Sequence, residues 1–188
     1  MKDALAVHRA LLGWETAHEI VRLPIAIAHA DELPRALGLP AERCLVTRVY
    51  TCHDVPRGRR FLTGVIVRAG ARPSAEAVRV ATGARIVRPA RPDVVNAVTE
   101  YAAGLVCPLL LPDAMRLLAD ERAVTGAAAD EVVYTATGDA STALGIRGRT
   151  LLALCRAAPV DPFSPPDLPP DARRLNRPNT GEPRHPVG

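Results

Sequence analysis

Apolar residues recur at helical spacing in several segments of the chain. Residues 3 to 12 place Ala4, Val7, Leu11 and Leu12 on one face, which predicts an N-terminal helix that ends at Gly13. Further helices are expected over residues 32–37, 74–81, 93–99 and 149–157. Several of these begin at a capping residue such as Ser74 or end at a glycine.

Short β-branched and apolar runs between these helices predict strands. Residues 44–51 and 60–68 are expected to pair around a polar turn at 55–59, and further strands are expected at 84–87, 105–111, 115–120, 131–137 and 143–147. Many short strands with irregularly inserted helices match neither strict βαβ alternation nor an all-β pattern. We therefore expect a mixed α/β (α+β) fold, with a curved, barrel-like mixed β-sheet surrounded by helices.

Length and composition suggest one domain followed by a tail. The chain has 188 residues, 48% of them hydrophobic, which suffices for a continuous core in residues 1–158. Only 3% are aromatic, so aliphatic side chains must fill that core. Nine of the eighteen prolines lie in residues 159–188 with few apolar residues. We expect this tail to be extended or disordered, with docking to a partner as the alternative.

Neither a membrane span nor a signal peptide is expected. The longest apolar runs, such as Leu105 to Pro112, are far shorter than the ~20 residues that a span needs, and charged residues interrupt the N-terminal segment. We therefore expect a cytoplasmic protein without membrane contact. Small buried hydrophobic residues are the favoured interpretation of the cysteines, because their spacing matches no CxxC pair and no zinc module. They are Cys44, Cys52, Cys107 and Cys155.

Positive charge is concentrated in the middle of the chain. From Arg43 to Arg91 there are eleven arginines and only two acidic residues. Such a segment suits a polyanionic partner such as tRNA. The arginines also alternate with apolar residues, and Lys2 is the only lysine. Solvated strand faces in an arginine-rich chain are therefore the simpler explanation of the charge by itself.

The segment from Thr99 to Pro108 is the one that stands out for chemistry, since GxSxG, P-loop, HExxH and GxGxxG motifs are all missing from the sequence. A predicted helix ends here, Gly104 permits unusual backbone angles, and Pro108 fixes the chain. Such a Gly–Pro loop can turn backbone N–H groups toward a developing oxyanion or a ligand ester. From spacing alone, a helix-to-strand connector is the simpler interpretation.

Six short motifs, in order, resemble the YbaK/EbsC (ProX-like) aminoacyl-tRNA deacylases, a family of trans-editing domains. Gly104-x-x-x-Pro108, preceded by Thr99 and Tyr101, looks like the family loop TGYxxGGxxPxG. Residues 43–46 (Arg-Cys-Leu-Val) are similar to its KTLV strand. The six motifs lie at residues 31–46, 74–87, 99–108, 120–121, 133–138 and 148–152.

The resemblance implies a domain that hydrolyses mischarged tRNA in trans, with no metal or cofactor. Its partners would be the 3′ end of aminoacyl-tRNA and, as a second candidate, an aminoacyl-tRNA synthetase. Backbone groups of the Gly–Pro loop would position ester and water, which is the main need of an already activated ester. The resemblance assigns catalytic roles to Arg43, Gly104 and Pro108. It assigns substrate binding to Cys44, Tyr101, Leu105, Thr137, Gly138 and Gly145.

Departures from the family pattern cluster where substrate would sit. Arg43 replaces the KTLV lysine and Cys44 its threonine, while Glu100 and Leu105 replace two loop glycines. Gly145 stands where several relatives have a pocket acid. Arginine keeps the positive charge, but its planar fork is not equivalent to an ammonium. A non-catalytic binding module of the same fold is therefore the alternative function. The amino acid removed, the tRNA and the oligomeric state are left open.

Overall fold

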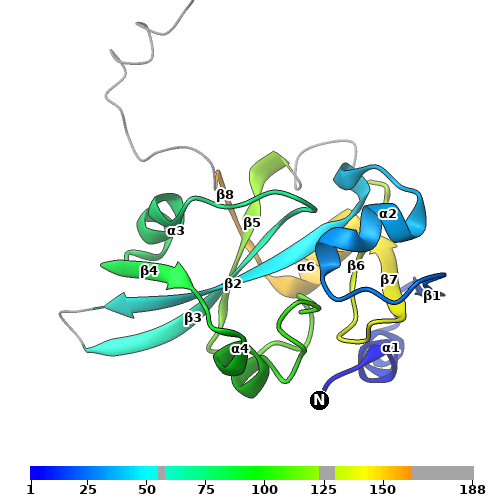
Figure 1. The fold of residues 1–188 in the computed structure, drawn as a ribbon, viewed down its shortest axis with the longest axis horizontal. Helices are drawn as coiled ribbons and strands as arrows, with labels where there is room; N and C mark the ends of the chain where they lie inside the picture. The colour runs from blue at the N-terminus through cyan, green and yellow to red at the C-terminus, as the bar shows by residue number, and fades with distance from the viewer. Residues whose placement is uncertain (55–57, 123–129, 162–188) are drawn as a thin grey trace, which may run out of the picture.

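The computed structural model describes residues 1–54, 58–122 and 130–161, and its strands form two sheets (Figure 1). The first sheet is antiparallel, with strands β1 (His18–Arg22), β7 (Thr142–Arg147) and β6 (Val132–Ala136) in that order. The second has the order β4 (Ile86–Pro89), β2 (Leu45–Asp54), β3 (Arg59–Arg68), β5 (Arg116–Asp120) and β8 (Ala158–Val160). It is mixed, because β5 pairs parallel with both β3 and β8.

Helices surround the two sheets (Figure 1). They are α1 (Ala4–Gly13), α2 (Leu33–Leu37), α3 (Ala75–Thr82), α4 (Pro92–Thr99) and α6 (Gly148–Cys155). Two 3-10 turns, η1 (Ala30–Glu32) and η2 (Ala41–Arg43), flank α2.

Capping residues fix helix ends that the sequence predicts. Asp3 accepts a hydrogen bond from the Ala6 N–H at 2.9 Å, and Ser74 accepts one from the Ala77 N–H at 3.4 Å. Each bond satisfies a donor that the first turn of a helix leaves without an intrahelical partner. Gly83 ends α3 with a φ of 70°, which glycine adopts without strain. The two predicted helices at these positions, α1 and α3, are therefore confirmed.

Three clusters of buried apolar side chains hold the elements together. We call them the inter-sheet core, the α2 cluster and the α3 cluster. Their central members are Leu45, Ile66, Leu144 and Ile146 in the first, Cys44, Leu33, Leu105 and Ala136 in the second, and Tyr50, Val65 and Val78 in the third. Full burial of one such aliphatic side chain contributes about 1.5–3 kcal/mol. The inter-sheet core makes the two sheets one packed unit.

The mixed α/β fold class is confirmed, with corrections to its strands. The described strands form two sheets joined by a bridge between Cys44 and Tyr134, not one closed barrel. The strand predicted at 105–111 is wrong, because this buried segment is irregular. The sequence analysis also missed β1 and β8. The first is short and partly charged, and the second includes a proline.

Strand β8 carries the sheet past the boundary expected at residue 158. Pro159 and Val160 pair with β5 at the edge of the second sheet, where a proline is tolerated. Most of the predicted tail (residues 162–188) and part of the predicted 55–59 turn (residues 55–57) lie outside the described residues. Within the described part of the chain, no helix has the length and apolarity needed to cross a membrane.

Candidate functional site

The segment from Tyr101 to Leu110, which we call the Gly–Pro loop, is largely buried although it forms no strand. Its carbonyl groups find donors in other parts of the structure. These donors are the Ala30 N–H to Gly104 O (2.9 Å), the Tyr101 hydroxyl to Leu109 O (3.0 Å), the Lys2 ammonium to Leu110 O (2.7 Å) and the Cys155 thiol to Pro108 O (3.5 Å). A buried carbonyl without a partner costs about 1–3 kcal/mol, so these bonds fix the loop in place of a strand ladder.

Gly104 lies where another segment crosses the Gly–Pro loop closely. A Cβ atom added at Gly104 would lie against the carbonyl oxygen of Ala28 and 2.6 Å from Nδ1 of His29. Contacts this short would force the backbone or the ring to move. The glycine is therefore required by close approach, whereas the positive φ values in the chain belong to other residues. The expectation that Gly104 is needed for unusual backbone angles is therefore wrong, because its φ is not positive.

Burial dominates the chemistry of the other predicted residues in this loop. Leu105 and Pro108 are buried, and the ring of Tyr101 is fully buried with its hydroxyl engaged by Leu109. Burial raises the pKa of Tyr101, and it raises the pKa of Cys107 to about 12. Neither group ionises near neutral pH, so neither is a ready nucleophile or base. Direct contact of Tyr101 with substrate stays a prediction.

The single lysine of the chain clamps the end of α4 to the Gly–Pro loop. The Nζ atom of Lys2 lies 2.7 Å from Leu110 O, 3.1 Å from Thr99 O and 3.0 Å from a carboxylate oxygen of Glu100. It also lies 5.6 Å from the ring centroid of Tyr101. An ammonium has three donors, and all three are occupied. Lys2 therefore holds the loop and is not a free catalytic amine.

Arg43 and Cys44 lie where η2 meets the first sheet. The Nε–H of Arg43 donates to Val132 O at 2.7 Å, and Nε lies 3.3 Å from a carboxylate oxygen of Glu131. Cys44 is buried, which raises the pKa of its thiol to about 11. This thiol is a core group, as predicted for the cysteines. Within the described residues, Arg43 makes no polar contact with the Gly–Pro loop.

The turn between β6 and β7 packs against the Gly–Pro loop. The hydroxyl of Thr137 shares a 2.7 Å hydrogen bond with that of Thr142. Gly138 has a φ of 92°, and a Cβ added there would lie 2.7 Å from Cδ1 of Tyr101 and against the carbonyl oxygen of Lys2. The structure thus brings Gly138 and Tyr101 into contact, and their binding of substrate stays a prediction.

The space that a side chain at Gly145 would fill is taken by a carboxylate from the neighbouring strand. Glu19 of β1 and Tyr134 of β6 flank Gly145 in register. A Cβ at Gly145 would lie 2.6 Å from Oε1 of Glu19, and the Tyr134 hydroxyl donates to that oxygen at 2.8 Å. This hydrogen bond raises the pKa of Tyr134. The sequence analysis missed Glu19 because it missed β1; a period-two search around residue 19 is the signal that could have found it.

Residues 23–30 contact both the Gly–Pro loop and the turn between β6 and β7. The Leu23 N–H donates to Ser141 O at 2.8 Å and the Ile27 N–H to Ala140 O at 2.9 Å, just after the Gly138 turn. The same segment reaches the Gly–Pro loop through Ala30. Gly104 and the Gly138 turn therefore lie on the two sides of residues 23–30, whereas Arg43, Cys44 and Gly145 are placed by contacts with β6 and β1. His29, which belongs to this segment, was not singled out from the sequence.

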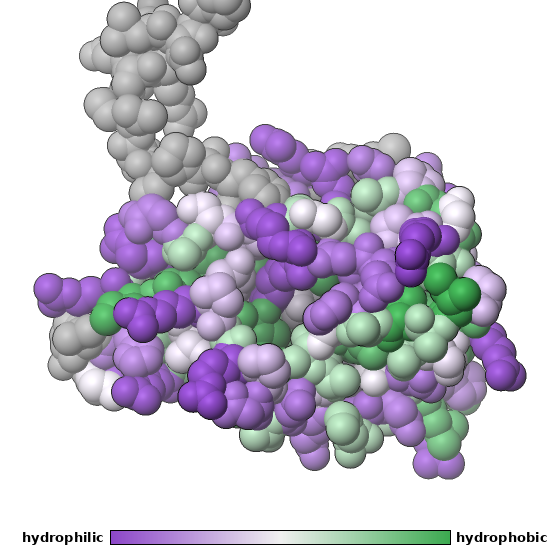
Figure 2. Space-filling model, viewed as in Figure 1, coloured by the Kyte–Doolittle hydropathy of each residue, from purple (hydrophilic) through white to green (hydrophobic). Residues whose placement is uncertain are grey.

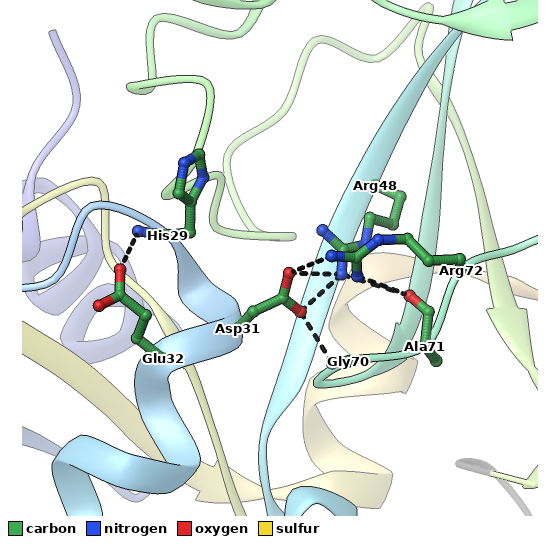
Figure 3. A network of polar contacts seen from close by, with 7 residues as sticks. All are labelled: His29, Asp31, Glu32, Arg48, Gly70, Ala71 and Arg72. Carbon is green, nitrogen blue, oxygen red and sulfur yellow. Dashed lines mark hydrogen bonds and ion pairs between the residues drawn. The ribbon is translucent and has the colours of Figure 1, made fainter.

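A network centred on Asp31 anchors the end of that segment (Figure 3). Its carboxylate accepts from Arg48 at 2.5 and 2.7 Å and from the Gly70 N–H at 2.8 Å, and it lies 3.0 Å from Arg72. Burial opposes the ionisation of Asp31, but the hydrogen bonds from Arg48 and Gly70 outweigh it and lower its pKa. The network ties η1 to β2 and to the turn that follows β3.

Only some of the described arginines in the basic middle segment form ion pairs. Of the arginines in this segment that the structure describes, six pair with carboxylates, namely Arg43, Arg48, Arg68, Arg72, Arg79 and Arg91. The exposed residues Arg59, Arg60, Arg85 and Arg88 lie at the end of the second sheet formed by β2, β3 and β4. Hydrophilic side chains project from this end in Figure 2. These arginines leave a basic surface there.

Comparison with known proteins places this arrangement in a family. Residues 26–154, which contain the Gly–Pro loop, the Gly138 turn and the Asp31 network, match the aminoacyl-tRNA editing domain. The chain belongs to this family. The prediction made from the six motifs is therefore confirmed, and with it the function of an aminoacyl-tRNA editing domain. Among curated proteins, no relative matches the chain significantly.

Solved structures of other proteins show the same fold. A crystal structure of the hypothetical protein APE2540 superposes with a TM-score of 0.70 at 20% identity, covering 82% of this chain and 97% of that one. A candidate trans-editing enzyme for prolyl-tRNA synthetase gives a TM-score of 0.68 at 23% identity, covering 84% of this chain and 94% of that one. At these identities the similarity establishes the fold of this editing domain. Across the described residues, no cluster of three or more His, Cys, Asp or Glu side chains is arranged to hold a metal.

Proposed function

We propose that this editing domain acts in trans, hydrolysing the ester bond between an amino acid and the 3′-terminal ribose of a mischarged tRNA. Family membership over residues 26–154 carries this proposal. It is supported by the Gly–Pro loop, whose position is fixed by hydrogen bonds from residues 2, 30 and 155. A loop held in this way can keep an ester and a water in one orientation without moving during the reaction.

The basic end of the second sheet would bind the tRNA backbone. Arg59, Arg60, Arg85 and Arg88 are exposed there, and guanidinium groups bind phosphates well. Because each phosphate contact releases counterions, binding should weaken steeply as salt rises. Replacing Arg85 and Arg88 together by alanine should therefore reduce both the affinity for tRNA and its dependence on salt.

Arg43 would approach the 3′ end with the two terminal nitrogens of its guanidinium. Its Nε–H is used by Val132 and Glu131, whereas no hydrogen bond from its two terminal nitrogens is found among the described residues. Arg43→Ala should abolish deacylation. Glu131→Gln is the matched control, because it removes the ion pair and keeps the guanidinium. Equal losses in both variants would show that Arg43 acts only by joining η2 to β6.

The decisive experiment is a deacylation assay on a panel of correctly and incorrectly charged tRNAs. The structural likeness to a candidate trans-editing enzyme for prolyl-tRNA synthetase makes mischarged proline tRNA the first substrate to include. Hydrolysis of a few mischarged species by the purified protein would support the proposal. Silence across the whole panel, with tRNA binding retained, would instead support the non-catalytic binding module.

A further inference from the structure

The Gly–Pro loop can hold an ester but offers no group that takes up a proton. The side chains from Ala102 to Val106 are apolar, and burial raises the pKa of Cys107 to about 12. Attack by water on an ester is faster when a positioned base accepts the proton that the water loses. A protein side chain that serves as such a base would have to come from an element packed against the loop.

His29 is packed against the loop at Gly104. Its Nδ1 and Cε1 atoms lie 2.6 and 3.2 Å from the place of a Cβ on Gly104, so one edge of the imidazole covers the glycine. The residue is nevertheless exposed to solvent. In Figure 3 its ring points away from Asp31 and toward a neighbouring loop. The imidazole therefore lies between the loop and the solvent from which a substrate would approach.

The backbone around His29 is held rigidly. One carboxylate oxygen of Glu32 accepts from the Ala28 and His29 N–H groups, each at 3.0 Å. The Ala30 N–H donates to Gly104 O at 2.9 Å. The first two bonds brace the turn that carries His29, and the third ties this turn to the loop. A backbone held in this way keeps the imidazole beside the loop, which reduces the freedom that must be lost during the reaction.

We infer that His29 is a catalytic residue, the general base of the ester hydrolysis; this inference rests on the proposed function. The neutral imidazole removes a proton from water while the water oxygen forms a bond to the ester carbonyl carbon. The resulting tetrahedral intermediate then breaks the bond between that carbon and the ribose oxygen. The imidazolium returns the proton to the departing oxygen, so the products are the free amino acid and a tRNA with a free ribose hydroxyl.

The charged groups beside His29 belong to its own turn. Glu32 lies in its own turn and pairs with Arg35 at 3.3 Å. Asp31 is turned away toward Arg48. The facing part of the Gly–Pro loop, residues 102–106, contributes no charged side chain. A pH dependence that disappears with the imidazole would therefore point to His29 itself.

The test is single-turnover deacylation of the aminoacyl-tRNA that the wild-type protein hydrolyses fastest, measured from acid to neutral pH. His29→Ala and His29→Gln should each lower the rate about 100-fold, with affinity for the tRNA unchanged. The wild-type rate should rise from acid to neutral pH, and the variant rates should lack this rise. His8→Ala is the matched control, because His8 lies on α1 with its ring 2.8 Å from His18. It should behave as wild type.

Several results would overturn the inference. These are a rate within about threefold of wild type in either variant, or a reduced rate that keeps the wild-type pH dependence. Full activity in His29→Gln alone would assign His29 a positioning role, which also contradicts a general base. If the wild-type protein hydrolyses nothing in the panel, the proposed function fails. If the wild-type and variant proteins are equally active, only the role of His29 fails.

Discussion

The α3 region and the Gly–Pro loop are stabilised in opposite ways. Ser74 and Gly83, the residues that begin and end α3, are its immediate neighbours in sequence, and its apolar face packs on the adjacent sheet. The loop is fixed instead by distant partners, such as Lys2, which is 108 residues away from Leu110. A change in α3 should therefore remain local. A change at a partner of the loop should alter both stability and the site.

The largest effect on stability is expected from Tyr101→Phe. The substitution leaves the carbonyl of Leu109 without its 3.0 Å donor in a fully buried place, so the free energy of unfolding should fall by about 1–3 kcal/mol. Urea denaturation measures this loss, and the deacylation rate should fall with it. Tyr134→Phe is the matched control. Its hydroxyl donates a hydrogen bond to Glu19 in an exposed position, so a smaller loss of stability is expected. Equal losses in the two variants would contradict the claim that the buried hydrogen bond to Leu109 is what stabilises the loop.

An effect that depends on pH is expected at Asp31, which anchors the segment between the two regions. Its pKa is lowered below 3.8, so its ionised form stabilises the folded state. That contribution is fully present above about pH 4 and disappears as pH falls through the lowered pKa. Asp31→Asn should therefore be less stable than wild type at pH 7 and approach it in strong acid. Denaturation curves at several pH values test this, and a difference that persists unchanged into strong acid would contradict it.

The smallest effect is expected from Ser74→Ala in α3. Loss of this cap should lower the free energy of unfolding by about 1 kcal/mol. The rate of deacylation should stay at the wild-type value, because α3 makes no contribution to the loop. Thermal unfolding and the deacylation assay measure the two quantities on the same sample. A loss of activity here would show that the two regions are coupled.

The same difference explains which parts of the fold the sequence predicts. Capping by Ser74 and Gly83, and the pairing of β2 with β3, depend on residues close in sequence, so periodicity finds them. The Gly–Pro loop has the apolar composition of a buried strand and was predicted as one from residue 105 to 111. Its irregular path becomes stable only because Lys2 and Ala30 supply donors from elsewhere. No local pattern contains that information.

The candidate site shows the same limit. From spacing alone, the segment around Gly104 and Pro108 is a helix-to-strand connector; it is the family resemblance that assigns it, and the Thr137–Gly138 turn, to the site. His29 was missed because it reaches the site across a non-local contact with Gly104, and Glu19 was missed together with strand β1. The reason for a glycine at 104 also emerges only from the fold, since it is the crossing of Ala28 and His29 that leaves no room for a side chain.

The most direct test of the central claim, that the Gly–Pro loop is where aminoacyl-tRNA is hydrolysed, is the deacylation rate of Gly104→Ala. Gly13→Ala is the control, because a Cβ at Gly13 meets nothing within 4 Å. The account predicts that the first variant loses at least about 100-fold in rate, as expected when reacting groups are displaced by about 1 Å. It predicts that the second variant matches wild type. Wild-type activity in a folded Gly104→Ala protein would contradict the account.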